Sequence, residues 1–339
     1  MKQSTSENII EYIRKREKST GKEITDYLGD ITDRAVRKQL RTLTEKGILQ
    51  KVGKPPRVYY LLKEIKQINI GDIQNTTESF SIAIHNIDRN IIRTIDKRYL
   101  YISPSGKFQE GWIGFIEWCE KTELPIEKTA KSYIEHLKKY DKFKKEGLIN
   151  GIDKFKETFD IVYLDKIFYL DFYSIERFGK TKLGQILLYA KQGSNKKLIV
   201  NLINIIKPQI LKIIKKYEID GVIFVPPTVK RDIQLMKELE TRINLPIGIL
   251  HVDKLKTDII VPQKTLSKLK DRIDNAKNTF AVKGNTTYNN ILIIDDAVGS
   301  GATLNEIAKQ LRTFKIVKKN IIGLGITGSF KGFDVISEI

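Results

Sequence analysis

Two adjacent acids, Asp295 and Asp296, stand shortly before a run of small residues, Gly299-Ser300-Gly301-Ala302-Thr303. Small side chains let backbone N–H groups close around a phosphate, and a helix that begins there adds the positive end of its dipole. Two carboxylates beside such a loop are placed to accept hydrogen bonds from a sugar diol. The stretch therefore predicts a site for a phosphorylated sugar.

The flanking residues indicate which elements position this stretch. Residues 291–294 are an uninterrupted apolar run, as expected for a strand buried on both faces of a parallel sheet. After the loop, apolar residues recur at helical spacing, at Leu304, Ile307, Ala308 and Leu311. This order of strand, loop and helix puts the acids at the carboxyl end of a strand, where open α/β sheets bind ligands.

The acid pair and the glycine-containing loop resemble the signature with which type I phosphoribosyltransferases bind phosphoribosyl pyrophosphate (PRPP). The resemblance implies that Asp295 and Asp296 hold the ribose hydroxyls and that the loop holds the 5-phosphate. Gly299 departs from the family, which often has Thr or Ser there, so one hydroxyl is missing while the backbone amide remains. The alternatives are a generic nucleotide-type loop or acids that cap the next helix. The sequence differs from the P-loop pattern G-x-x-x-x-G-K-[ST].

A second segment, residues 225–231, also follows an apolar, strand-like run. It resembles the loop that holds pyrophosphate in type I enzymes. The resemblance implies that Pro227 and Thr228 contact the ligand, while Lys230 and Arg231 supply catalytic positive charge. It also implies Mg²⁺ as a cofactor, held through PRPP and not directly by protein side chains.

A third segment, residues 262–280, has a spaced pattern of Gln, Leu, Arg, Asn and Phe. This pattern resembles the ComF-like branch of the family, which is linked to DNA uptake and related processes. The Arg-rich segment that many ComF proteins carry after the pyrophosphate loop is not recognisable. The resemblance implies a flap over the reacting centre that includes Gln263, Arg272 and Asn275. The alternative is an amphipathic, cationic surface helix.

Residues 1–64 predict a small domain of three helices followed by a hairpin. This plan resembles the winged helix-turn-helix family, whose third helix enters the DNA major groove. The cations that the resemblance assigns to nucleic-acid binding are Arg34, Arg37, Lys38, Arg41, Lys54 and Arg57. The alternative is a protein–protein or dimerisation module with a solvated cationic face.

Residues 65–160 predict a mainly helical spacer or partner-binding region, which is where we expect a homo-oligomer contact or a partner protein. From residue 161 strands alternate with helices, which indicates a parallel sheet. The expected fold class is α/β. A Rossmann-like parallel sheet of the type I phosphoribosyltransferase kind occupies residues 161–339, preceded by the winged-helix domain and the helical spacer.

Composition narrows the functional classes. The 339 residues include 60 Lys and Arg against 41 Asp and Glu, and the formal net charge of +19 favours polyanionic partners such as nucleic acid. The single cysteine, Cys119, excludes an internal disulfide, and the three histidines lack a metal-binding spacing. The polar first residues are unlike a signal peptide, and no apolar run is long enough for a membrane span. We therefore expect a cytoplasmic protein without membrane contact.

Two functions from different classes follow. One is a PRPP-dependent, Mg²⁺-assisted transferase that displaces pyrophosphate with an unknown nitrogen acceptor, as an effector of a prokaryotic conflict or defence system would. The other is a non-catalytic, PRPP-sensing transcriptional regulator, because the purine operon repressor resembles this chain in plan. The cations after residue 229 favour catalysis, and the basic third helix favours regulation.

Overall fold

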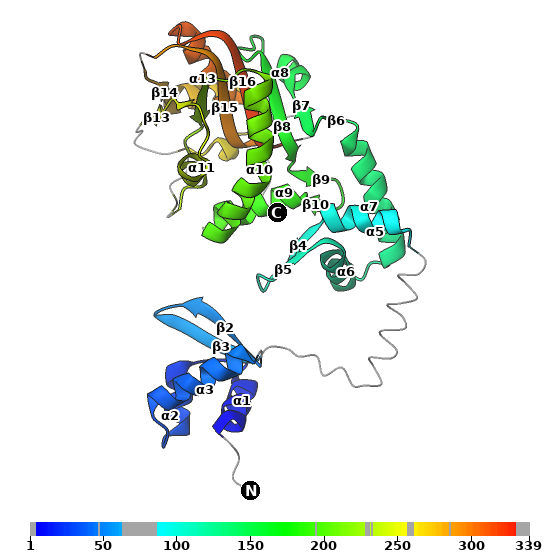
Figure 1. Ribbon diagram of the computed structural model, residues 1–339, viewed down its shortest axis with the longest axis vertical. Helices are drawn as coiled ribbons and strands as arrows, with labels where there is room; N and C mark the ends of the chain where they lie inside the picture. The colour runs from blue at the N-terminus through cyan, green and yellow to red at the C-terminus, as the bar shows by residue number, and fades with distance from the viewer. Residues whose placement is uncertain are drawn as a thin grey trace. The chain divides into compact units, whose positions relative to one another are not determined.

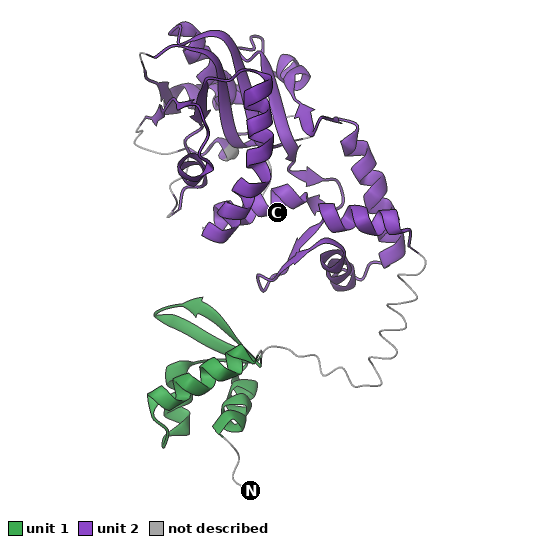
Figure 2. Cartoon of the chain, viewed as in Figure 1, with its two compact units in different colours: residues 1–85 green, residues 86–339 purple. Residues whose placement is uncertain are grey.

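A computed structural model describes residues 5–46, 48–62, 87–193, 195–227, 231, 233–255, 261–284 and 286–329. The chain forms two compact units, residues 1–85 and residues 86–339 (Figure 2). Each unit has hydrophobic core clusters of its own. None of the helices in the described ranges has the length and apolarity needed to cross a lipid bilayer.

In the part of the first unit that the structure describes, three helices combine with a three-stranded antiparallel sheet in which β3 lies between β1 and β2. Figure 1 shows α1, α2, α3 and the β2–β3 hairpin. Its elements are α1 (Thr5–Arg16), β1 (Lys18–Thr20), α2 (Gly21–Leu28), α3 (Asp33–Glu45), β2 (Leu49–Lys54) and β3 (Arg57–Leu62). The helices and the β2–β3 hairpin agree with the elements expected from the sequence. The short strand β1 is an addition to them.

Helix α3 illustrates how local sequence fixes this unit. Thr32 caps its first turn, because the Thr32 hydroxyl accepts a hydrogen bond of 3.3 Å from the Ala35 N–H. Val36, Leu40 and Leu43 recur at helical spacing and are buried. The cap and the packing together determine which side of α3 remains exposed to solvent.

The second unit is organised around a seven-stranded sheet with the order β12-β11-β15-β16-β8-β7-β6 (Figure 1). The first five strands are parallel to one another, and β7 and β6 add an antiparallel edge. The fold is therefore mixed α/β with a mostly parallel sheet. The strands are β6 (Lys144–Lys145), β7 (Leu148–Asn150), β8 (Lys166–Phe172), β11 (Gly221–Phe224), β12 (Gly248–Ile249), β15 (Tyr288–Val298) and β16 (Val317–Gly328).

Helices cover both faces of this sheet. One face packs against α9, α10 and α11, and the other packs against α8, α12 and α13. The helices of the unit are α5 (Arg89–Arg98), α6 (Gly111–Lys121), α7 (Ile126–Asp141), α8 (Ile152–Thr158), α9 (Lys182–Gln192), α10 (Lys196–Lys216), α11 (Leu235–Ile243), η1 (Gln263–Thr265), α12 (Leu269–Thr279) and α13 (Ala302–Thr313). Short two-stranded pairs join β4 (Leu100–Ile102) to β5 (Phe108–Glu110), β9 (Ser174–Ile175) to β10 (Gly179–Lys180), and β13 (Val252–Lys254) to β14 (Phe280–Val282).

Strand β15 contributes to the core on both faces of the sheet. Ile291 and Ile293 belong to the cluster that includes α13, whereas Leu292 and Ile294 belong to the cluster that includes α9, α10 and α11. All four side chains are fully buried. Successive side chains of a strand point to opposite faces, so a strand covered on both sides requires an unbroken apolar run.

The neighbouring strands β11 and β15 are followed by helices on opposite faces. Helix α11 packs through Leu235 and Leu239 in one core cluster, while α13 packs through Leu304 and Ile307 in the other. The loops that leave the two strands therefore diverge at the carboxyl edge of the sheet. Such a switch in the connections is where open α/β sheets form a crevice for ligands.

The described part of the expected spacer, residues 87–160, packs into the second unit. Strand β7 pairs with β8 at the sheet edge, and Phe115, Tyr133 and Phe155 belong to the same core cluster as Ile293. The boundary between the compact units accordingly falls between residues 85 and 86, whereas the sequence interpretation began a separate domain at 161. Helical periodicity identifies these helices but not the surface on which they pack.

Two local features differ from what their residue types favour, since a proline inside a helix favours a kink or a split and the apolar residues 161–164 favour a strand. Helix α10 is one continuous element through Pro208. Ile206 and Ile210 are buried on either side of the proline, so tertiary packing holds the helix together. Residues 161–164 lie outside any strand. The Asn305 side chain holds them instead, because its oxygen accepts from the Tyr163 N–H and its nitrogen donates to the Ile161 carbonyl, both over 2.9 Å.

Replacing Phe155 tests whether residues 87–160 stabilise the sheet. Its side chain is 1% exposed and lies in the common core, so Phe155→Ala should lower the unfolding free energy of the second unit by about 3–5 kcal/mol. The matched control is Phe314→Ala, because that ring is 59% exposed and its loss should cost less than about 1 kcal/mol. Denaturant unfolding measures both values. A loss at Phe155 no larger than at Phe314 would contradict the packing of this segment in the core.

Candidate functional site

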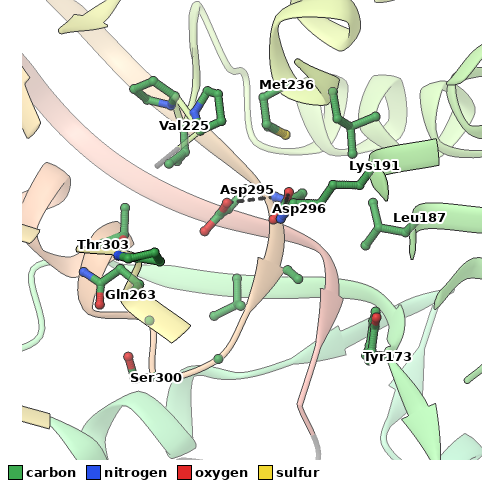
Figure 3. Close-up of a pocket in the computed structure, with 18 of the residues that line it drawn as sticks. Tyr173, Leu187, Lys191, Val225, Met236, Gln263, Asp295, Asp296, Ser300 and Thr303 are labelled. Carbon is green, nitrogen blue, oxygen red and sulfur yellow. Dashed lines mark hydrogen bonds and ion pairs between the residues drawn. The ribbon is translucent and has the colours of Figure 1, made fainter. Parts of the chain in front are cut away.

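The crevice between the diverging loops contains a cavity of about 240 Å³. Its lining comes from both loops and from α9, α11 and α12. Figure 3 shows Lys191 of α9 and Met236 of α11 beside the acid pair. The residues predicted from the sequence that line it are Pro227, Arg231, Gln263, Arg272, Asp295, Asp296, Gly299, Ser300, Gly301, Ala302 and Thr303. Residues far apart in the sequence are thus brought together around one cavity.

Asp295 and Asp296 lie within β15, which continues past them to Val298. The Asp296 N–H donates a hydrogen bond of 2.8 Å to the Asp295 carboxylate. In Figure 3 the Asp296 side chain points toward Lys191, while Asp295 lies on the side of Thr303. The two acids therefore face different parts of the cavity.

Lys191, which the sequence interpretation did not select, is the partner of Asp296. Its Nζ lies 2.6 Å from Asp296 Oδ2, and the two side chains are 39% and 13% exposed. The charge of Asp296 raises the pKa of Lys191, so the lysine stays protonated at neutral pH. Asp296 continues the alternation of Leu292 and Ile294 and therefore faces the α9 side of the sheet. The only signal for Lys191 was a cation in the last turn of a predicted helix, where cations are common.

The negative charge of Asp295 is less well balanced by neighbouring groups than the charge of Asp296. Burial raises the pKa of Asp295 to about 7, and the neighbouring charge of Asp296 adds to the rise. The charge of Lys191 and the Asp296 N–H act in the opposite direction and only partly offset it. The site therefore combines a carboxylate paired with lysine and a buried carboxyl group whose pKa lies near neutral pH.

The loop after the acids is short, because β15 ends at Val298 and α13 begins at Ala302. Gly301 has a φ of +81°, and a Cβ at this position would overlap the ring of Phe155. Backbone conformation and space both require glycine there. The Phe155 side chain from α8 thus supports the loop directly, which the sequence interpretation did not foresee.

A second residue of α8 also holds this loop. Lys154 Nζ donates to the carbonyl oxygens of Gly299, over 3.4 Å, and of Ser329, over 3.3 Å.

Helix α13 begins without a side-chain cap, and the Ala302 N–H makes only a long contact of 3.4 Å with Ser300 Oγ. The first N–H groups of a helix have no acceptor within the helix, so this turn offers the donors that bind phosphate groups.

The segment after β11 forms another wall of the cavity. Pro226 and Pro227 line it, and Arg231 Nη1 donates to the Lys191 carbonyl over 3.5 Å. Arg231 and Lys191 therefore lie close together on this side. Thr228 and Lys230 lie outside the described residues, so their roles stay predictions.

The segment expected as a flap is a packed element in this structure. Helix α12 buries Arg272 and Ala276, and β14 pairs with β13. Gln263 Nε2 donates to the Arg272 carbonyl over 3.0 Å, and Asn275 Nδ2 donates to the Val261 carbonyl over 3.1 Å. Gln263 and Arg272 line the cavity, while Asn275 ties α12 to the preceding segment.

In the first unit, the predicted nucleic-acid-binding cations are exposed. Lys54 and Arg57 are cross-strand partners next to the turn of the β2–β3 hairpin. Four cations of α3 fall within an arc of about 100° around the helix axis. They lie opposite the buried residues and are Arg34, Arg37, Lys38 and Arg41. The exposed side of α3 is thus a candidate phosphate-binding surface.

Two of these cations already have partners on α3. Arg37 pairs with Asp33, and Arg41 Nε lies 2.8 Å from Glu45 Oε1. Exposed ion pairs of this kind contribute little to stability. Within the described residues, Arg34 and Lys38 make no such pair.

Asp295→Asn tests the charge balance of the acid pair. Because the folded-state pKa of Asp295 is about 7, against an ordinary value of 3.8, the folded chain binds this proton more tightly than the unfolded chain. This tighter proton binding adds to the unfolding free energy below about pH 4. The added free energy is lost as the pH rises through about 7. The stability of Asp295→Asn relative to the unaltered protein should therefore increase from pH 4 to pH 7 and then level off. Urea unfolding across this range measures it, with pH 4 as internal control. If the difference in unfolding free energy between Asp295→Asn and the unaltered protein does not change with pH, the raised pKa of Asp295 is contradicted.

Comparison with known proteins gives a limited similarity. No protein-family model matches this chain. Over 58 residues the chain is 38% identical to Competence protein F of Haemophilus influenzae. The match spans 16% of this chain and 25% of that protein. The chain thus matches about a quarter of that relative, which indicates a weak, ComF-like relation over a short part of the sequence.

Proposed function

We propose that the second unit is a phosphoribosyltransferase-like domain of the type I fold and that it binds PRPP in the cavity at the carboxyl edge of the sheet. The observation that carries the proposal is one cavity lined by the acid pair, the Gly299–Thr303 loop and the first turn of α13. The mostly parallel sheet and the similarity to Competence protein F support it.

In this proposal each part of the cavity binds one part of PRPP. The N–H groups of the loop and of α13 bind the 5-phosphate, together with the hydroxyls of Ser300 and Thr303. Asp295 and Asp296 accept hydrogen bonds from the two ribose hydroxyls. Lys191 holds Asp296 in place through the 2.6 Å ion pair, so less conformational freedom is lost when the ribose binds.

The reaction we propose displaces pyrophosphate from C1 of the ribose by a nitrogen nucleophile. The bond from C1 to the pyrophosphate oxygen breaks, and pyrophosphate leaves with the bonding electron pair. A C1–N bond forms, and the nitrogen loses a proton. Arg231, with Lys230, supplies positive charge beside the leaving group. Asp295 accepts the proton, because a carboxyl group with a pKa of about 7 suits a general base.

Mg²⁺ fits the donor chemistry of this site. Carboxylate and phosphate oxygens are the ligands that Mg²⁺ prefers, and Asp295 and Asp296 provide carboxylates beside the cavity. Within the described ranges, no group of three or more His, Cys, Asp and Glu side chains gathers as a metal ligand set. In the proposal, most ligands are therefore oxygens of PRPP. The ion, when bound, would neutralise the leaving pyrophosphate.

Pyrophosphate release from PRPP tests the proposal, with Mg²⁺ present and pooled nucleobases, amines and DNA as acceptors. Asp295→Asn combined with Asp296→Asn removes two charge-assisted hydrogen bonds, each worth roughly 1.5–3 kcal/mol, so PRPP affinity should fall at least ~100-fold. The matched control is Asp26→Asn combined with Asp30→Asn, two exposed acids of the first unit. Unchanged PRPP binding in the first variant would contradict the site assignment.

For the first unit we propose a winged helix-turn-helix domain that contacts nucleic acid through α3 and the β2–β3 hairpin. The exposed arc of cations on α3 favours this function. It also favours the second candidate for the whole chain, a non-catalytic, PRPP-sensing DNA-binding regulator. The release assay separates the two: release that depends on an acceptor identifies an enzyme, whereas PRPP binding that shifts DNA affinity without release identifies a regulator.

Salt dependence tests the nucleic-acid surface. Arg34→Ala combined with Lys38→Ala removes two cations without a partner on α3, so the slope of log binding constant against log salt should flatten by about 2. Arg37→Ala combined with Arg41→Ala should act in the same direction. Arg14→Ala combined with Lys22→Ala removes two exposed cations of α1 and α2 and is the control. If both α3 variants keep the original slope for duplex DNA, α3 is not the contact surface.

A further inference from the structure

Arg272 carries a buried guanidinium for which the protein provides little compensation. The residue is 3% exposed, and its Nε donates to the Leu266 carbonyl over 2.8 Å. Its Nη2 is buried and has no hydrogen-bond partner among the described residues. Burial lowers the pKa of Arg272, as expected where the charge is poorly solvated. Folded proteins rarely bury a charge in this way unless a partner balances it.

The uncompensated end of Arg272 faces the loop of the cavity. Its Nη1 lies 3.9 Å from the position that a Cβ of Gly299 would occupy, and both residues line the cavity. Gln263, which anchors the Arg272 carbonyl, also lines the cavity and has a buried Oε1 without a partner. Helix α12 and the turn before it thus bring two unsatisfied polar side chains to the edge of the loop.

We propose that Arg272 is a phosphate ligand, whose Nη atoms bind oxygens of a phosphate monoester seated in the Gly299–Thr303 loop. The assignment rests on the proposed function, because it gives the 5-phosphate of PRPP a second set of donors. A phosphate dianion offers three acceptor oxygens, and the planar guanidinium binds two of them side by side. The unpartnered Oε1 of Gln263 is an acceptor that suits a hydroxyl of the same ligand.

The loop geometry allows hydrogen-bond donors to contact a bound phosphate from two sides. Lys154 draws the Gly299 carbonyl toward itself. The carbonyl and the N–H of one trans peptide point in opposite directions, so the Ser300 N–H is directed away from Lys154. The phosphate then lies between the backbone donors of the loop and the guanidinium of Arg272. Arg272 acts as a fixed ligand on a packed helix and not as a group that arrives when a flap closes.

Calorimetric titration of the full chain with ribose 5-phosphate and with inorganic phosphate tests the assignment. Arg272→Met should weaken binding of both by about 10- to 100-fold, because a charge-assisted, bidentate contact is lost. Arg272→Lys should retain part of the affinity. Lys277→Met removes an exposed cation from the same helix and should bind as the unaltered protein does.

A rescue variant separates a ligand role from a purely structural one. A Cβ at Gly299 would meet Arg272 Nη1 only at the ordinary contact distance of 3.9 Å, so serine is chosen as the smallest side chain that carries a hydroxyl. Gly299→Ser combined with Arg272→Met should recover part of the lost phosphate affinity, because the new hydroxyl supplies a donor. A structural defect at Arg272 would not respond in this way.

The outcomes distinguish this inference from the proposed function. Arg272→Met that binds ribose 5-phosphate as tightly as the unaltered protein overturns the inference. If PRPP binding requires Asp295 and Asp296 but is indifferent to Arg272, only the inference fails. If the unaltered protein binds neither PRPP nor ribose 5-phosphate, the proposed function fails with it.

Discussion

Two parallel strands that lie side by side, β11 and β15, are followed by helices on opposite faces of the sheet, and the geometry of the cavity depends on this divergence. If α11 and α13 lay on the same face, their side chains would fill the space between the loops. Because they separate, the strand ends, the uncapped first turn of α13 and the proline segment after β11 all border one opening. The apolar alternation of Ile291 to Ile294 makes this arrangement possible, since it gives both layers of helices a core to pack on.

Charged side chains line the cavity that the diverging loops after β11 and β15 leave open. Its described lining residues include three cations, Lys191, Arg231 and Arg272, and the two acids Asp295 and Asp296. Burial raises the pKa of Asp295, the charge of Asp296 adds to the rise, and the charge of Lys191 partly offsets it. Lys191 balances one acid, whereas Arg272 lacks an acid partner among the described residues. The excess of positive charge favours an anionic ligand, and the acid pair favours one that also carries hydroxyl groups.

Sequence patterns identified the parts of this site that are local in the chain. The acids, the small-residue loop and the following helix form one continuous stretch, so their spacing predicts their arrangement. Lys191, Lys154 and Phe155 were not identified because each reaches the site from a distant helix through tertiary packing. Helical periodicity likewise located most helices of residues 87–160 but not their place in the core, and it did not indicate that α12 packs as a fixed element. The fold class followed from alternating strands and helices, while the sheet order depends on pairings between distant segments.

The contact between Phe155 and Gly301 has a consequence for how the chain can be divided. Every residue of the acid pair and the loop lies after position 290, so a fragment that begins at residue 161 would contain the complete motif. It would nevertheless lack the ring on which the loop rests and the lysine that orients its carbonyl. The recognisable motif and the physically complete site are therefore different lengths of chain, and the smallest piece that retains the site must extend back through α8.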